Sequence, residues 1–98
     1  MLEQKDVLYA YKIIGANVAK IRKQKKYSQL KLSLAMGHNS VSLVSFSEIC
    51  LKGAHFNIEH LLQISMILEV NVMDFFVGVD EFLLNLKEKN KIEENDIS

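Results

Sequence analysis

Residues 28–50 read SQLKLSLAMGHNSVSLVSFSEIC, and they contain the most informative signals for helix starts and turns in this chain. Ser28 is a favourable helix N-cap, because its hydroxyl can accept a free backbone N–H of the next turn. Tyr27 and Leu32 stand at the two positions of a hydrophobic staple, which would hold that helix start. Gly37 can adopt the left-handed conformation that ends a helix and turns the chain. The stretch therefore predicts two short helices joined by a sharp turn.

The first helix of the pair is predicted over residues 29–36, with a buried face of Leu32, Ala35 and Met36. The second is predicted from Val41 to about Cys50, with Asn39 or Ser40 as its cap. Its buried face is expected to be Leu43, Phe46 and Cys50. Counting from that face, the residues expected to point outward are Ser40, Val41, Val44 and Ser45.

Helices are also predicted on both sides of this pair. Residues 3–25 carry one apolar stripe at spacings of three and four, although Gly15 would weaken the helix by about 1 kcal/mol and leaves a break there open. Asn57 and Asn71 are predicted caps of two further helices, the second of them short. Asp80 is a predicted cap of a last amphipathic helix that ends near Asn90, and the polar, acidic residues 91–98 are expected to form a flexible tail.

The composition describes one small folded domain of 98 residues, with 49% hydrophobic residues and no proline. The absence of proline suits an all-helical chain, since proline interrupts helices. The single cysteine cannot form an internal disulfide, which favours a reducing compartment, and we expect a cytoplasmic protein. The opening MLEQKD does not resemble a secretory signal, and no apolar run approaches the ~18 residues of a membrane span.

The net charge of zero hides a division of charge along the chain. Residues 1–52 carry nine Lys or Arg against three Asp or Glu, whereas residues 53–98 carry three against nine. Between Lys12 and Ser47 there are seven basic residues and no acid. Such a one-sided field attracts phosphate backbones, although a solvated helix surface would have the same composition.

These features resemble the Cro/cI, or XRE, family of helix-turn-helix regulators over roughly residues 15–76. Besides Ser28-Gln29, Leu32 and Gly37, the matching stretches are VAKIRK at 18–23, NIEHLLQI at 57–64 and LEVNVMDFF at 68–76. The resemblance implies an all-α, five-helix lambda-repressor-like DNA-binding bundle, here with an extended N-terminal helix and an extra C-terminal helix. The implied division is an extension at 1–14, the helix-turn-helix domain at 15–78, an amphipathic helix at 79–90 and the tail at 91–98.

The resemblance also implies roles for individual residues. Gln29 matches a glutamine that opens the second family helix and contacts a phosphate. Arg22 matches an arginine that pairs with a glutamate in the recognition helix; the matching position is Ser47, so we expect Arg22 to pair with its neighbour Glu48. Lys20 and Lys23 are expected to attract the phosphate groups of the DNA backbone. The full predicted DNA-binding set is Ser28, Gln29, Lys31, His38, Asn39, Ser40, Val41, Ser42, Val44, Ser45 and Lys52.

The predicted recognition helix lacks the long or forked side chains that usually contact base edges. In one interpretation, Ser40 and Ser45 bond bases or phosphates while Val41 packs against thymine methyl groups, and the protein is a DNA-binding, repressor-like transcriptional regulator. In the alternative, Val41 and Val44 belong to an exposed apolar patch that binds a protein, and the chain is an interaction module or antitoxin on the same fold.

A second expected partner surface is the stripe formed by Val79, Phe82, Leu83 and Leu86. It could fold back on the N-terminal helix around Val7 and Tyr11, or it could pair with a second copy as a homodimer. The sequence contains no nucleophile with a plausible base and no phosphate-binding glycine loop, so we expect neither an enzyme nor a cofactor. Cys50, His55 and His60 do not match a common zinc spacing, so no metal is expected.

Overall fold

The computed structural model describes residues 2–97, with side chains described as far as Lys91, and all elements of regular secondary structure in these residues are helical. In chain order the elements are α1 (Gln4–Gln24), α2 (Gln29–Ala35), α3 (Ser42–Ile49), the 3₁₀ turn η1 (Leu51–Gly53), α4 (Ile58–Leu68), the 3₁₀ helix η2 (Val72–Phe76) and α5 (Val79–Ile97). The prediction of an all-α chain is therefore confirmed.

Three helix starts form as their local sequence predicts. The Ser28 hydroxyl accepts the backbone N–H of Lys31 at 2.9 Å, and the Asn57 side chain accepts that of His60 at 2.8 Å. Asn71 accepts the N–H of Met73 at 2.9 Å and so opens η2. Each cap satisfies a backbone donor that has no partner within its own helix.

Other boundaries differ from the prediction. Helix α3 begins at Ser42 instead of Val41, and α5 begins at Val79, so that Asp80 lies in the first turn and is not the cap. On α2, Ala35 is exposed although we expected it on the buried face. Helix α1 runs without a break through Gly15, and one helix thus joins the expected extension at 1–14 to the domain that follows.

The core lies where α1, α2, α3, α4 and η2 meet. Its fully buried centre is formed by apolar side chains from all five elements, with exposed fractions of 0–2%: Val18, Leu32, Val44, Leu61, Ile64, Leu68 and Phe75. Burial of such side chains stabilises the fold by about 1.5–3 kcal/mol each. The helix pair α2–α3 therefore rests on α1 and α4 and is held by tertiary packing.

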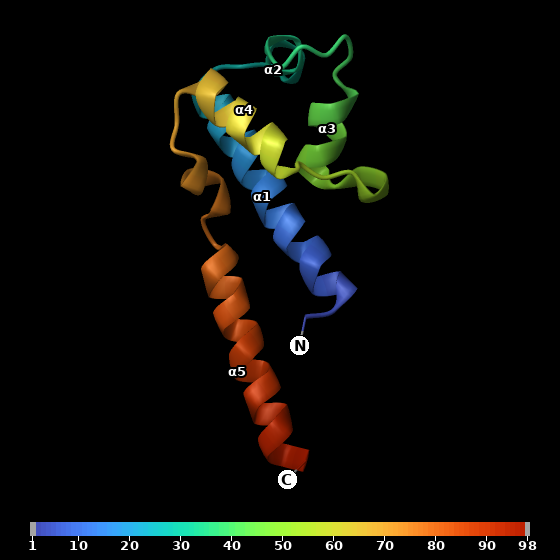
Figure 1. Cartoon of the computed structure of the whole chain (residues 1–98), viewed down its shortest axis with the longest axis vertical. Coiled ribbons are helices and arrows are strands. Elements are labelled where there is room, and N and C mark those ends of the chain that lie inside the picture. The colour runs from blue at the N-terminus through green and yellow to red at the C-terminus, as the bar shows by residue number, and fades with distance from the viewer. Residues whose placement is uncertain (1, 98) are drawn as a thin grey trace.

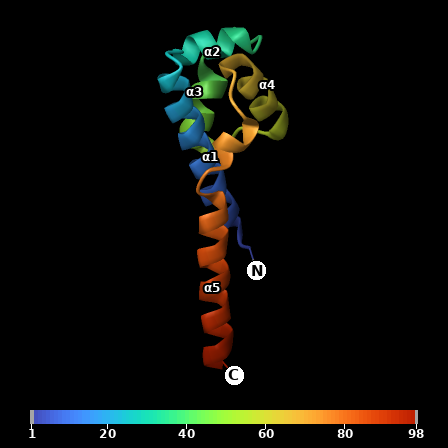
Figure 2. The ribbon, with the colours of Figure 1, turned by 90° about the vertical axis from the view of Figure 1, so that its left-hand side faces the viewer.

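Helix α5 projects from this body, and Figures 1 and 2 show it extending past the N-terminal end of α1. The molecule measures 55 × 26 × 19 Å as a result. The last helix was expected to end near Asn90, and this boundary is wrong, because α5 continues through residues 91–97 of the expected tail; Ser98 lies outside the described residues. The segment has neither glycine nor proline, and its Lys and Glu residues are good helix formers.

The first part of α5 does fold back on α1. Phe82 lies against Tyr9 with ring centroids 4.7 Å apart, and Val79 packs on the core. The contact on α1 is thus Tyr9 and not the expected Tyr11, which stacks on His55 at 3.8 Å. Leu83 stays 40% exposed. None of the described helices combines the length and apolar character that crossing a bilayer requires.

The start of α4 makes the stability of the fold depend on pH. The Asn57 backbone N–H donates to Nδ1 of His60 at 3.1 Å, which requires that this nitrogen carry no proton. Burial lowers the pKa of the His60 imidazole, and the nearby charge of His38 lowers it further. The stabilisation that His60 provides is present above its unfolded pKa of about 6.5 and is lost as the pH falls toward the lower folded pKa.

We therefore expect His60→Gln to flatten the loss of stability between pH 7 and about 5, because glutamine can fill the same capping position at any pH. Urea unfolding followed by circular dichroism at several pH values measures this slope. His55→Gln is the matched control and should keep most of it. An equal slope in His60→Gln and the unmodified chain would contradict the assignment.

Candidate nucleic-acid interface

A buried ionic network joins the three helices around the α2–α3 turn. Arg22 of α1 donates from Nε to Glu48 Oε2 of α3 at 2.7 Å and from Nη2 to Oε1 at 3.1 Å. Its Nη1 donates to the Tyr27 carbonyl oxygen at 2.8 Å. The two charged side chains are only 7% and 3% exposed, and their expected pairing is present. This forked, desolvated geometry fixes the orientation of α3 on α1.

Gln29 belongs to the same network. Its Nε2 donates to Glu48 Oε1 at 2.8 Å and so connects α2 to α3. We expected this side chain to contact a phosphate. One of the two N–H donors of this amide is engaged by the Glu48 carboxylate, and the second N–H is left for the expected contact.

Helices α1 and α3 approach closely at Gly15. A Cβ atom built there would lie 2.6 Å from the carbonyl oxygens of both Ser47 and Glu48. Ser47 is fully buried at this contact, and its hydroxyl has no hydrogen-bond partner among the described residues. The absence of a side chain at Gly15 and the small one at Ser47 thus let the two backbones pack together.

This packing corrects the predicted orientation of α3. Val44 is fully buried, although we expected it to point outward, and Phe46 is 36% exposed, although we expected it in the core. The buried face is Val44, Ser47 and Glu48, because Ser47 fits against Gly15 and Glu48 pairs with Arg22. Val44 therefore cannot contact DNA or a protein, and the proposed Val41/Val44 patch does not exist as such.

The outward face of α3 follows helical spacing and consists of Ser42, Ser45, Phe46 and Ile49. Ile49 is 65% exposed. The face is therefore polar at the start of the helix and apolar at its end. Phe46 and Ile49 are functional candidates that the sequence did not reveal. The expected pairing of Arg22 with Glu48 was the signal that could have indicated this orientation, because it requires Glu48 on the buried side of α3.

The serine hydroxyls at the start of α3 are partly engaged. Ser40 Oγ accepts the Ser42 backbone N–H at 3.0 Å and donates to Ser42 Oγ at 2.9 Å. Ser45 Oγ donates to the Ser42 carbonyl oxygen at 3.4 Å. The Ser42 hydroxyl is exposed, so an external group can reach it. Asn39 is exposed in the preceding turn, while His38 and Val41 are half-buried.

The predicted cationic residues lie on the surface of the bundle, and Lys20 among them lines a hollow between α1 and η2. Lys20, Lys23 and Lys52 are exposed. The ammonium group of Lys31 lies 4.2 Å from the centre of the Tyr27 ring, a favourable cation–π contact that also positions its charge beside the N-terminus of α2. The bundle thus presents separate ammonium groups from α1, α2 and η1.

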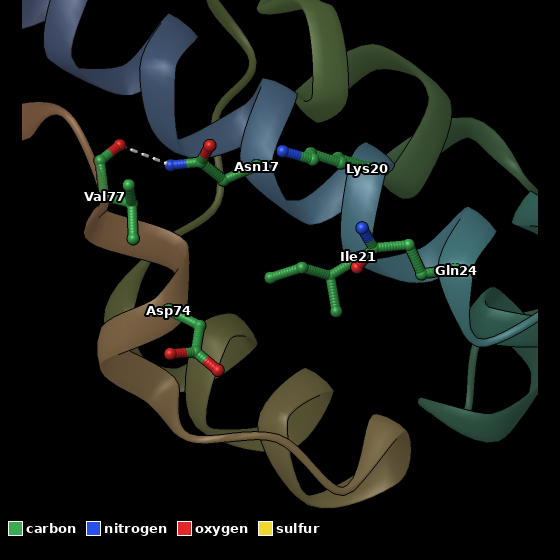
Figure 3. A pocket seen from close by; sticks show the side chains of 6 residues that line it. All are labelled: Asn17, Lys20, Ile21, Gln24, Asp74 and Val77. Carbon is green, nitrogen blue, oxygen red and sulfur yellow. Dashed lines mark hydrogen bonds between the residues drawn. The ribbon is translucent and has the colours of Figure 1, made fainter.

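A shallow hollow of about 240 Å³ lies between α1 and η2. Figure 3 shows Asn17 at its edge, where the side-chain Nδ2 donates to the Val77 carbonyl oxygen at 2.8 Å. The same Nδ2 donates to the Phe75 carbonyl oxygen at 2.8 Å. Asn17 therefore attaches η2 to α1, and the hollow is a junction between these two elements.

The thiol and the two histidines considered for a metal have other environments. Burial raises the pKa of the Cys50 thiol, against a smaller opposing effect of Lys12, so the thiol stays protonated and weakly reactive. His55 stacks on Tyr11, and His60 caps α4. Among the residues with described side chains, no three His, Cys, Asp or Glu gather into a group that could hold a metal ion.

Comparison of the chain with protein-family models, with curated proteins and with solved structures gave no match.

Proposed function

We propose that this protein is a DNA-binding transcriptional regulator of the cytoplasm, repressor-like, in which α2 and α3 form a helix-turn-helix and α3 enters the major groove. The observation that carries the proposal is the Arg22–Glu48–Gln29 network, which connects α1, α2 and α3 through one carboxylate. A protein that contacts base edges requires a rigid helix pair, because small displacements of the recognition helix would break its hydrogen bonds to the bases.

Charge and size support the same proposal. An eight-residue helix is about 12 Å long, similar to the width of the major groove, and α3 has eight residues. The exposed lysines Lys20, Lys23 and Lys52 and the held ammonium of Lys31 would contact phosphates and so supply most of the affinity. Buried Val44 takes no part in this interface, and Gln29 supports it from within the protein.

We expect a homodimer on a two-fold DNA site. Helix α5 supports this, since it projects from the body while Leu83 and Leu84 are 40% and 59% exposed. A two-fold site of this kind has half-sites about 34 Å apart, one for the α3 helix of each copy. Sedimentation of the free protein and of its DNA complex reports the number of copies directly.

The test is binding of the purified protein to random duplex DNA at several salt concentrations. We expect steep salt dependence, and we expect the double variant Lys20→Ala/Lys23→Ala to lower the slope by about one unit for each phosphate that is no longer neutralised. Lys87→Ala on α5 removes the same charge far from the helix pair and serves as the control. If neither variant changes the salt dependence of DNA binding, α1 is not part of the interface.

A protein-interaction module or antitoxin on the same fold is the second candidate. The observation that favours it is a row of exposed apolar side chains along α4, where Ile58, Leu62 and Met66 are 65%, 50% and 80% exposed. Large exposed apolar patches more often meet proteins than nucleic acids. If the unmodified chain binds no duplex even at low salt, this second function is favoured and DNA binding is rejected.

A further inference from the structure

If α3 is the recognition helix of the proposed helix-turn-helix, its exposed face carries two apolar side chains toward the groove, in the second half of the helix. Phe46 is 36% and Ile49 65% exposed, and helical spacing puts them on one face with Ser42 and Ser45. The core is well packed, since Val44, Leu32 and Phe75 are completely buried. Phe46 and Ile49 are therefore surface residues and do not mark a gap in the core. The face is thus free to meet a ligand.

The same face offers no forked hydrogen-bonding group. The one charged residue of α3 is Glu48, whose carboxylate accepts three hydrogen bonds from Arg22 and Gln29. Paired contacts to guanine or adenine edges need arginine, lysine, asparagine or glutamine, and the outward residues of α3 include none of these. Hydrogen bonding from this helix would therefore be limited to serine hydroxyls, of which that of Ser42 is exposed.

The major groove contains one apolar group, the C5 methyl of thymine. We infer that Phe46, with Ile49 about one turn further along α3, recognises thymine methyl groups and makes them the main source of sequence preference. This inference rests on the proposed DNA-binding function and names the chemistry of its target, a thymine-containing duplex half-site. Burial of one methyl against an aromatic ring corresponds to a preference of about fourfold.

The experiment begins with selection of duplexes from a random library by the unmodified protein. In the enriched duplex, each thymine is then replaced in turn by uracil, which removes the methyl and leaves every hydrogen-bonding group in place. We expect the Kd to rise about fourfold at one or two thymines. In Phe46→Ala the same replacements should cause no further loss, and Phe46→Leu should restore part of the penalty.

Ile58→Ala is the matched control, because it removes an exposed apolar side chain from α4 and should keep the full uracil penalty. Circular dichroism of each variant establishes that it is folded. A selected site without thymine preference, uracil tolerated at every position, or an equal penalty in Phe46→Ala and the unmodified protein would overturn the inference while leaving DNA binding intact. Failure of the unmodified protein to retain any duplex would overturn the proposed function and the inference together.

Discussion

Replacing Glu48 by methionine is expected to lower the free energy of unfolding by about 3–5 kcal/mol. The substitution leaves the Arg22 guanidinium buried without its carboxylate, and it removes the acceptor of Gln29. Since a domain of this kind is stable by only about 5–15 kcal/mol, a large part of its stability would be lost. Urea unfolding followed by circular dichroism gives the change from the midpoint and slope of the transition.

The double variant Arg22→Met/Glu48→Met separates the effect of the buried charge from the effect of packing. With both charges removed, no unpaired ion stays buried, and we expect the double variant to be more stable than Glu48→Met alone. Glu88→Ala is the control, since it removes an exposed carboxylate from α5. If Glu48→Met costs no more than this control, the network contributes as little as an exposed pair, below about 1 kcal/mol.

Gly15→Ala is expected to destabilise the protein by about 1–3 kcal/mol, although alanine is the better helix former by about 1 kcal/mol. The added Cβ would lie 2.6 Å from two backbone carbonyl oxygens of α3, at Ser47 and Glu48, and neither can rotate away. Helices α1 and α3 would have to separate, which would also strain the Arg22–Glu48 contact. The same unfolding measurement tests this.

Ala16→Gly supplies the comparison, because Ala16 is the exposed neighbour of Gly15 in the same helix. It should show the cost of glycine alone, about 1 kcal/mol, without any steric effect. A Gly15→Ala variant that is more stable than the unmodified chain by that same amount would mean that the two helices have room to adjust.

The helix boundaries were largely predictable because they depend on neighbouring residues. The hydroxyl of Ser28 and the amides of Asn57 and Asn71 cap helices through hydrogen bonds that span two or three residues. The end of α5 was not predicted, since the polar composition of residues 91–97 suggested fraying while the same residues favour a helix.

The ion pair and the orientation of α3 show how a site prediction can be right in one part and wrong in another. The pair of Arg22 and Glu48 was expected, yet the buried face was derived separately from the apolarity of Leu43 and Phe46. Apolar residues occur on both sides of α3, so their periodicity alone was compatible with two orientations. Had the pair been used to orient the helix, Val44 would have been placed inside.

The local sequence was sufficient to predict an all-helical chain, the starts of three helices, the turn at Gly37, where φ is +90°, and the basic character of the first half. Local hydrogen bonds, backbone preferences and charge counts suffice for these properties. Only the tertiary structure decided which residues of α3 face outward, the engagement of Gln29 by Glu48 and the close approach at Gly15. These depend on where α1 meets α3, a contact between residues more than 30 positions apart in the chain, at Gly15 and Ser47.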